Sequence, residues 1–386
     1  MARVLAYTSP ARGHLYPVAQ TLLELAGRGH EVNVRTLASE VGALRALGLR
    51  AEPVAPEIEA LPLDDWRGTS PQEAIGGVFR TFAARATHEV PDLRRAMADL
   101  APDLLMIDTA TPGAAAVAEA SSLPWVEWIP FFEHFEVAPG APPGLTRMPY
   151  TLAPDGMDVL DAPRRALGLA PLAGIEDAFR APLSLYFTAE PFEVGGLERP
   201  PTLRLVGPGL WEPPVEAPRW LDELEDPLVL VTASSEFQRD DALVSTALAA
   251  LSGEDLRVAV STVAHDPAGF AVPGNARVER WLPHGPAIRR AACVVCHGGM
   301  GITQRALAAG VPVCVVPFGR DQLEVAARVA ATGAGTVLTP DALTPGALLA
   351  AVRGAMTMGD GARLVAEGFA RAGGAPAAAD AVEALL

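Results

Sequence analysis

The sequence predicts an α/β protein made of two Rossmann-like, doubly wound domains. Short apolar runs rich in Val and Leu alternate with longer amphipathic segments along most of the chain. Such alternation is typical of parallel strands joined by right-handed helical crossovers. A Pro-rich segment interrupts the pattern at residues 208–218. Because 386 residues leave room for two cores of ordinary size, we interpret this segment as a linker between two domains.

The first domain is predicted to span residues 1–207. Its strands are expected at residues 4–7, 31–36, 104–108, 184–188 and 203–206. Helices are expected at residues 15–28 and 39–47, where apolar residues recur with helical spacing. Segments 55–80 and 130–180 are irregular and Pro-rich, so they are expected to form loops.

The linker is assigned to residues 208–220, where Pro recurs without periodicity and favours an extended, semi-rigid chain. The second domain, residues 221–386, repeats the pattern of the first. Its strands are expected at residues 228–232, 257–261, 277–280, 293–296, 311–316 and 336–338.

Composition argues against several classes of partner. Thirty Arg and no Lys face 46 Asp and Glu, which gives a formal net charge of −16. Such a field repels nucleic acid and anionic membranes, whose binding needs clustered basic residues. No apolar run reaches the roughly 18 to 20 residues that cross a bilayer, and strand-like residues begin too early for an apolar leader. We therefore expect a cytoplasmic monomer or homodimer without nucleic-acid or membrane partners.

The cysteines include the pattern Cys293-x-x-Cys296-His297, which matches c-type haem attachment and also occurs in redox and zinc sites. However, no second Cys or His pair lies nearby to complete a zinc shell. Residues three apart in a strand point to opposite faces, so the two thiols would not meet. The cysteines are predicted to be buried in the core.

The most informative segment begins with the strand predicted at residues 293–296. This strand stops at His297 and the glycine cluster Gly298-Gly299-Met300-Gly301, after which residues 304–310 indicate a helix. Backbone N–H groups at a helix N-terminus lack intrahelical partners and lie at the positive end of the helix dipole. Glycines at such a place let a phosphate approach closely. The segment is therefore predicted to hold an anion.

Other motifs accompany this turn in a fixed order. They are Gly13-His14-x-x-Pro17, Arg28-Gly29-His30, Trp281-Leu-Pro, Gly310-Val-Pro-Val-Cys-Val-Val-Pro317, Asp321-Gln322 and Gly333-Ala-Gly335. Together they resemble the signature of the family-one nucleotide-sugar-dependent glycosyltransferases, particularly the bacterial branch that decorates macrolides and other natural products. The resemblance implies the glycosyltransferase B (GT-B) fold, in which two domains face a cleft and ligands lie at the carboxyl ends of the strands. It also implies that the last helix, near residues 374–386, crosses back onto the first domain.

The resemblance implies catalytic roles for two residues of the first domain. His14 follows the first strand, and an imidazole can accept a proton near neutral pH, so His14 is the candidate general base. Asp108 ends the strand at residues 104–108 and is expected to orient His14 in a His–Asp dyad. The alternative is that each residue caps the helix that follows it.

Donor-binding residues are implied in the second domain. Trp281 would stack on the nucleotide base beside the Leu282 backbone, with core packing as the alternative for Trp281. Asp321 and Gln322 would bind sugar hydroxyls, although Asp at a helix start is also a common N-cap. The residues expected around the diphosphate, mostly through backbone N–H groups, are Ser235, His297, Gly299, Met300, Gly301, Ile302 and Thr303.

Two positions depart from the family pattern. Ser234 stands where Gly is usual. Arg305 stands where many relatives have a Glu that binds the ribose hydroxyls, and arginine cannot accept hydrogen bonds. Arg305 is interpreted as a phosphate contact or as a solvated residue. Because a 2′-deoxyribose needs the missing Glu less, a dTDP-sugar is favoured over a UDP-sugar.

The acceptor site is expected within residues 125–135, which hold five aromatic side chains in eleven positions. Large rings offer apolar area to a flat or lipophilic aglycone. The residues named for this role are Trp128, Phe131, Phe132 and Phe135. The alternative is an aromatic core layer, and His134 is either an acceptor contact or a solvated loop residue.

The sequence contains no Asp-x-Asp pair, which metal-dependent glycosyltransferases use to hold a divalent ion, so we expect transfer without a metal or cofactor. The predicted function is inverting transfer of a sugar from a nucleoside diphosphate to a hydroxyl of a natural-product aglycone. The alternatives are a sugar-nucleotide epimerase or hydrolase on the same fold, a C-glycosyltransferase, and a non-catalytic partner that binds a nucleotide sugar.

Overall fold

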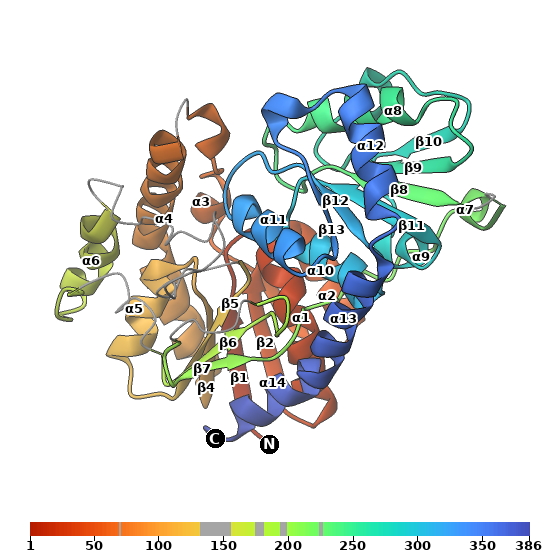
Figure 1. The fold of residues 1–386 in the computed structure, drawn as a ribbon. Helices are drawn as coiled ribbons and strands as arrows, with labels where there is room; N and C mark the ends of the chain where they lie inside the picture. Colours follow the sequence, from red (N-terminus) through yellow and green to blue (C-terminus); the bar gives the residue numbers. More distant parts are fainter. Residues whose placement is uncertain (69–70, 132–155, 174–180, 194–198, 224–226) are drawn as a thin grey trace.

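The computed structural model in Figure 1 describes residues 1–68, 71–131, 156–173, 181–193, 199–223 and 227–386. These residues form two parallel sheets with helices packed on their faces. The predicted α/β architecture, with one sheet in each half of the chain, is confirmed.

The first sheet has seven parallel strands in the order β3-β2-β1-β4-β5-β6-β7. They are β1 (Arg3–Tyr7), β2 (Glu31–Thr36), β3 (Arg50–Pro53), β4 (Leu104–Asp108), β5 (Trp125–Ile129), β6 (Leu183–Tyr186) and β7 (Leu203–Leu205). The sequence analysis missed β3, a short strand at the sheet edge with one buried residue. It also missed β5, which it interpreted only as part of an aromatic acceptor segment.

The second sheet has six parallel strands in the order β10-β9-β8-β11-β12-β13. They are β8 (Leu228–Thr232), β9 (Arg257–Ser261), β10 (Ala276–Glu279), β11 (Ala291–Cys296), β12 (Val313–Val315) and β13 (Gly335–Val337). All of the predicted strands of this half are present. Every residue of the central strand β8 is buried, as expected for a parallel sheet covered on both faces.

Helices cover both sheets. The first half contains α1 (Arg12–Gly27), α2 (Ala38–Ala46), α3 (Pro56–Glu59), the short 3₁₀ helix η1 (Asp65–Arg67), α4 (Pro71–Leu100), α5 (Pro112–Ala120) and α6 (Gly156–Ala166). The second half contains α7 (Arg219–Glu223), α8 (Asp241–Leu251), α9 (His284–Ile288), α10 (Met300–Ala308), α11 (Gln322–Ala331), α12 (Pro345–Ala355), α13 (Gly359–Arg371) and α14 (Gly374–Glu383), besides the 3₁₀ turns η4 (Pro267–Gly269) and η5 (Pro340–Ala342).

Helix α4 corrects the expectation of a loop that extends to residue 80. Pro71 stands at its first position, where a missing N–H costs no hydrogen bond. The helix continues through Gly76, Gly77 and Pro91, which are poor helix formers. Packing against α5 outweighs the low helix propensity of these residues.

The apolar core is continuous between the two sheets. One cluster contains Val4 and Leu104 of the first sheet together with Leu228 of the second. Cys296 faces this cluster, whereas Cys293 faces the core on the opposite side of the second sheet. Both thiols and that of Cys314 are free and buried, and burial raises their pKa values, in Cys314 to about 11. The prediction of core cysteines is confirmed.

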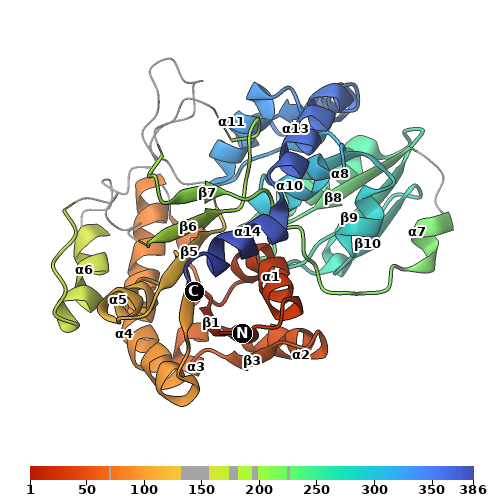
Figure 2. The ribbon, with the colours of Figure 1, turned by 90° about the horizontal axis from the view of Figure 1, so that it is seen from below.

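The last helix, α14, packs against α1 of the first half, so that the two chain ends lie close together in both ribbon views (Figures 1 and 2). Arg28 of α1 donates to Asp380 at 2.6 Å and to Glu383 at 2.8 Å. His30 Nε2 lies 2.9 Å from Glu383. These polar contacts join the C-terminal end of the chain to the first sheet.

Two further ion pairs join the halves. Arg328 of α11 donates to Glu193 at 2.9 Å, and both side chains are almost fully buried. Arg328 also pairs with Glu324 at 3.2 Å. Removing Arg328 would leave the buried Glu193 carboxylate without its cation, at a cost of about 3–5 kcal/mol. On the cleft side, Arg320 forms a two-pronged bond with Asp65 of η1, at 2.8 and 2.9 Å.

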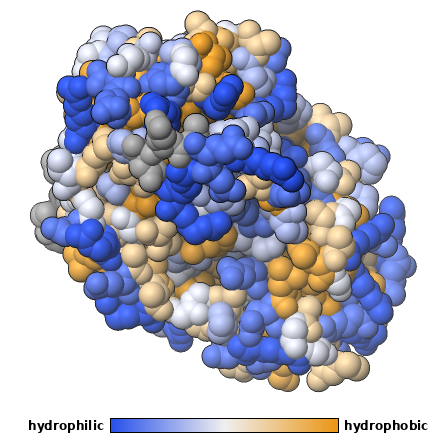
Figure 3. Space-filling view, turned by 90° about the vertical axis from the view of Figure 1, so that its right-hand side faces the viewer, coloured by the Kyte–Doolittle hydropathy of each residue, from blue (hydrophilic) through white to orange (hydrophobic). Residues whose placement is uncertain are grey.

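The exterior is largely polar on the face drawn in Figure 3, where hydrophobic residues occur in separate groups among hydrophilic ones. Within the ranges given above, none of the helices is both long and apolar enough to span a bilayer.

Candidate active site

A pocket of about 310 Å³ lies between the two halves, next to the carboxyl ends of the central strands. This edge is where ligands bind in open parallel sheets. From the first half, its walls include residues 11–14, 16–17, 63, 78, 82 and 130–131. From the linker and the second half, they include residues 209, 212, 232–236, 238, 263, 281, 284, 297, 299–302, 305 and 320–322.

His14 and Asp108 lie together at the first-half side of this pocket. His14 Nδ1 is 3.1 and 3.0 Å from the two carboxylate oxygens of Asp108. Asp108 is fully buried and also accepts hydrogen bonds from the backbone N–H groups of Ser9 at 2.9 Å and Ala110 at 3.0 Å. With the proton on Nδ1 donated to the carboxylate, Nε2 is the ring nitrogen left to accept a proton.

Of the aromatic residues near His14, one is buried in the core and another lines the pocket. Trp128 is fully buried and donates from Nε1 to the His14 carbonyl oxygen at 3.3 Å. The expectation that Trp128 contacts the acceptor is therefore corrected, because the central strand β5 directs this ring into the core. Phe131 does line the pocket, and its ring centre lies 5.8 Å from that of His14. Phe132, His134 and Phe135 lie outside the described residues.

Two buried carboxyl groups lie behind the dyad. Burial raises the pKa of Glu89 and of Glu127 to about 8, and the nearby Asp108 adds to the rise. Glu89 accepts from the Gly113 N–H at 2.8 Å, and Glu127 from the Ser184 hydroxyl at 3.4 Å. Both carboxyl groups keep a proton at neutral pH, so they add little negative charge beside Asp108.

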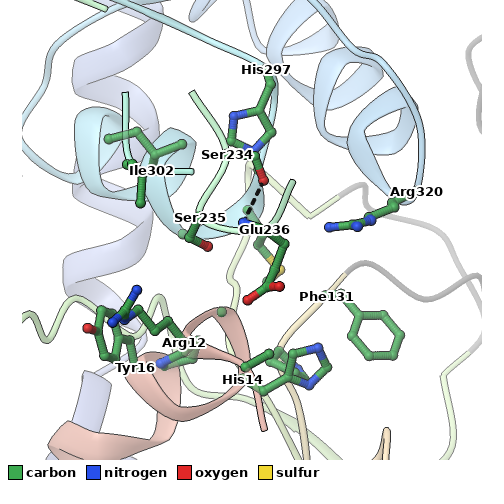
Figure 4. A pocket seen from close by; sticks show the side chains of 18 of the residues that line it. Arg12, His14, Tyr16, Phe131, Ser234, Ser235, Glu236, His297, Ile302 and Arg320 are labelled. Carbon is green, nitrogen blue, oxygen red and sulfur yellow. Dashed lines mark hydrogen bonds between the residues drawn. The ribbon is translucent and has the colours of Figure 1, made fainter. Parts of the chain in front are cut away.

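The glycine turn forms the opposite side of the pocket (Figure 4). Gly298 has φ +90°, and Gly299 is the N-cap of α10. A Cβ on Gly299 would lie 2.4 Å from His297 Nε2, so a larger residue there would displace this ring. Helix α10 begins at Met300, earlier than the sequence indicated, and its first turn presents Met300, Gly301 and Ile302 to the pocket.

The two histidines on the donor side are neutral at pH 7. Burial lowers the pKa of His297 to about 4, although Asp240 acts in the opposite direction, and lowers that of His284 to about 3. His297 Nδ1 has no hydrogen-bond partner among the residues described. The arginines of the pocket are already paired, Arg12 with Glu40 at 2.7 Å and Arg320 with Asp65. The α10 N-terminus adds positive potential at the turn.

Two predicted donor contacts face the core instead. The Thr303 hydroxyl lies 3.6 Å from Cys296 Sγ, and Thr303 is fully buried on the side of α10 that faces β11. Leu282 is also fully buried, and its N–H donates to Ser261 Oγ at 3.3 Å. Neither residue lines the pocket, which corrects the role given to the Thr303 hydroxyl; the Leu282 N–H is engaged within the protein.

Trp281 and the loop after β8 do line the pocket. The Trp281 ring is half-buried and stacks on that of His284, with centres 5.9 Å apart. Ser235 is exposed to the pocket. Ser234, which stands in place of the usual Gly, holds the loop, since its N–H donates to Asp240 at 2.6 Å and its hydroxyl accepts from the Glu236 N–H at 3.2 Å.

Asp321 and Gln322 both lie at the pocket wall. Asp321 is the N-cap residue of α11, although its side chain makes no capping bond. The Gln322 amide is already in use: its oxygen accepts from the N–H groups of Phe318 at 2.7 Å and Gly319 at 3.2 Å, and its NH₂ donates to Gln238 Oε1 at 2.5 Å. In this structure Gln322 shapes the pocket wall.

Arg305 lines the pocket but is mostly buried, so the interpretation as a solvated residue is wrong. Its guanidinium donates to the linker carbonyls of Leu210 at 2.5 Å and Trp211 at 2.8 Å. Glu212 of the same linker accepts from the N–H groups of His284 at 3.0 Å and Gly285 at 2.8 Å. Arg305 therefore fixes the linker against the donor side of the pocket.

Several pocket residues were missed by the sequence analysis. They are Arg12, Tyr16, Glu212, Glu236, Gln238, His284 and Arg320. For Glu236, a signal was available, because it directly follows Ser235 in a loop at the carboxyl end of a predicted strand. The others come from elements whose meeting depends on the tertiary fold.

Comparisons with known proteins agree with this arrangement. Residues 245–380 match the family described as "Erythromycin biosynthesis protein CIII-like, C-terminal domain". The chain is 32% identical to the 4'-demethylrebeccamycin synthase of Lentzea aerocolonigenes, over 91% of each chain. It is 28% identical to the L-demethylnoviosyl transferase of Streptomyces niveus, over 88% of this chain and 86% of that one. The crystal structure of the glycosyltransferase VinC in complex with dTDP superposes with a TM-score of 0.76, at 22% identity and over 99% of both chains.

The two facing sheets with a pocket between them define a GT-B enzyme, as the resemblance implied. The chain belongs to the glycosyltransferases of antibiotic and other natural-product biosynthesis. The predicted family, the GT-B fold and the glycosyltransferase activity are confirmed.

Proposed function

We propose that this glycosyltransferase is an inverting enzyme that moves a sugar from a nucleoside diphosphate to a hydroxyl of a lipophilic aglycone, without a metal ion. The observation that carries the proposal is the position of the His14–Asp108 pair across one pocket from the glycine turn at residues 297–301. A proton acceptor and an anion site then face the same enclosed space from opposite sides (Figure 4).

A proton acceptor and an anion site on opposite sides of one pocket suit a single-displacement reaction. The acceptor hydroxyl gives its proton to His14 Nε2, its oxygen bonds to the anomeric carbon, and the bond from that carbon to the diphosphate oxygen breaks. The diphosphate leaves toward the α10 N-terminus, whose N–H groups stabilise the developing negative charge. Asp108 stabilises the imidazolium. Attack from the side opposite the leaving group inverts the anomeric configuration.

Donor choice is supported by Trp281 and Arg305. The half-buried Trp281 ring at the pocket wall offers a face on which a nucleotide base can stack. Arg305 accepts no hydrogen bond and is engaged with the linker carbonyls of Leu210 and Trp211, so it leaves a ribose 2′-hydroxyl without an acceptor at this position. Stacking on Trp281 suits either base, whereas the missing acceptor at Arg305 favours dTDP over UDP; VinC, a structural relative, was solved with dTDP.

Acceptor choice is supported by the apolar part of the pocket. Leu63, Val78, Phe82, Pro130 and Phe131 line it from the first half. An apolar lining with few polar groups favours a lipophilic partner.

Isothermal titration with dTDP, UDP and GDP, each in magnesium and in EDTA, tests the donor side. We expect dTDP to bind more tightly than UDP and to bind equally in both buffers. A magnesium-dependent affinity would refute metal independence, and a preference for UDP would refute the donor assignment. Release of free sugar from dTDP-glucose, at an equal rate with and without an acceptor, would favour a hydrolase.

A further inference from the structure

Glu236 lies where the transferred sugar has to be placed. If His14 deprotonates the acceptor and the glycine turn holds the diphosphate, the anomeric carbon must lie between them. Glu236 belongs to the loop after β8 and lines this same space. Figure 4 shows its carboxylate reaching from the donor side, below Ser234 and His297, toward His14. The following argument rests on the proposed function, because it needs a sugar nucleotide in this pocket.

The Glu236 carboxylate is not used by the protein. Its backbone N–H donates to Ser234 Oγ at 3.2 Å, which fixes the start of the side chain. Within the part of the chain that the structure describes, the carboxylate has no ion pair and no side-chain hydrogen bond. Arg12 and Arg320 line the same pocket, but each is paired with another carboxylate, Glu40 and Asp65. Glu236 therefore keeps its acceptor capacity for a ligand.

The electrostatic surroundings of Glu236 are mixed. Burial raises the pKa of Glu236, while the charges of Arg320, His14, Arg12 and Arg85 lower it. The cations come from both halves of the cleft and oppose the cost of keeping a carboxylate in the pocket. An ionised acceptor makes a stronger hydrogen bond to a ligand hydroxyl than a neutral one does.

Gln238 supplies a complementary donor two residues further on. Gln238 is 7% exposed, lines the pocket, and has its oxygen occupied by Gln322 at 2.5 Å. Its Nε2 is buried and has no partner among the described residues. A buried amide N–H without an acceptor is energetically costly, unless an oxygen of a ligand accepts its hydrogen bond. Gln238 thus has an unused donor within the wall of the pocket that Glu236 also lines.

We infer that Glu236 is a specificity-determining residue for the donor sugar: its carboxylate accepts a hydrogen bond from a hydroxyl of the transferred sugar, and the Gln238 amide donates to an oxygen of the same sugar. Neighbouring sugar hydroxyls each donate and accept, so they match such a pair. This pair takes the role that the sequence suggested for Gln322, whose amide is occupied by the protein.

Calorimetry on the Glu236→Gln variant tests this inference, with Glu216→Gln, an exposed linker change, as the control. The probes are dTDP, dTDP-glucose and the four monodeoxy analogues of dTDP-glucose at carbons 2, 3, 4 and 6. We expect Glu236→Gln to weaken dTDP-glucose about 10- to 100-fold, the size of a hydrogen bond to a charged group, and to leave dTDP unchanged. One deoxy analogue should bind wild type weakly and lose nothing further in the variant.

Several outcomes would overturn the inference. Equal weakening of dTDP and dTDP-glucose would show that Glu236 only supports the loop. Unchanged affinity for both ligands would show that it makes no contact with the sugar. Loss of the acidic limb of the pH–turnover profile in Glu236→Gln would make it a proton acceptor instead. If wild type binds dTDP but neither dTDP-glucose nor UDP-glucose, the proposed function fails and this inference fails with it.

Discussion

Replacing Asp108 by Asn should remove both turnover and part of the stability of this enzyme. One carboxylate oxygen accepts from the Ala110 N–H at 3.0 Å and the other from the Ser9 N–H at 2.9 Å, while both lie within 3.1 Å of His14 Nδ1. Asn has only one oxygen. Whichever way the amide turns, its NH₂ group faces a backbone N–H that has lost its acceptor.

The magnitudes follow from this geometry. A buried N–H without an acceptor costs about 1–3 kcal/mol, so the free energy of unfolding of Asp108→Asn should fall by that amount. The new NH₂ group also favours the His14 tautomer with its proton on Nε2, the nitrogen that must accept the proton of the acceptor. Turnover should therefore fall by about 10² to 10⁴, the range of general-base catalysis.

Urea unfolding and turnover at saturating donor concentration measure the two effects separately. His14→Ala is the matched control, because it leaves the Ser9 and Ala110 bonds to Asp108 in place. The control should lose turnover to a similar extent and lose less stability than Asp108→Asn. Near-normal turnover of Asp108→Asn would refute the dyad, and unchanged stability would refute the hydrogen-bond argument.

Three further predictions concern the donor site and the buried carboxyl groups. Gly299→Ala should weaken dTDP binding at least ~10-fold, because its Cβ would lie 2.4 Å from His297 Nε2, whereas Gly346→Ala of α12, with nothing within 4 Å and outside the pocket, should bind normally; equal affinities in calorimetry would contradict this. Trp281→Ala should weaken dTDP about 5- to 100-fold, the value of one stacked base, and Trp281→Phe should retain most of the affinity; a larger loss with Phe than with Ala would exclude stacking. Burial raises the pKa of Glu127 from 4.5 to about 8. The contribution of Glu127 to stability is therefore complete below pH 4.5 and is lost as the pH rises to about 8. Over this pH range the free energy of unfolding of the wild type, measured in urea, should fall by about 1.4 kcal/mol per pH unit more than that of Glu127→Gln. Parallel pH dependences of the two proteins would disprove the assignment.

Much of the fold could be predicted because parallel strands buried on both faces are continuous apolar runs. The strand at residues 228–232 is such a run, and its predicted ends agree with β8. Helix α4 could not be found in this way, because Gly76, Gly77 and Pro91 conceal its helical pattern. Its stability comes from packing on α5, which no local pattern records.

The residues of the site likewise fall into those that the sequence could place and those that it could not. Asp108 ends β4, while His14 and Gly299 lie in the segments that follow β1 and β11. Parallel strands bring their carboxyl ends to one edge, so sequence order was sufficient to place these residues. The sequence did not show toward which side of its helix or strand each side chain points. Thr303 and Trp128 therefore proved to face the core.

Residues that meet only through the tertiary fold were also out of reach. Arg305 was interpreted as a phosphate contact or as a solvated residue. Its hydrogen-bond partners are the carbonyls of Leu210 and Trp211, which lie 95 and 94 residues away in sequence. The sequence places Glu236 next to Ser235, but its position across the pocket from His14 of the other half is seen only in the tertiary structure (Figure 4). No spacing within either half indicates such a pair.

Transfer of labelled sugar from dTDP-glucose to a panel of flat phenolic acceptors, in EDTA, tests the central claim most directly. Wild type should form a glycoside with inverted anomeric configuration. His14→Ala should be slower by about 10² to 10⁴ while its affinity for dTDP stays unchanged. A product of retained configuration, or equal rates for the two proteins, would contradict the account of His14 as the base of a single displacement.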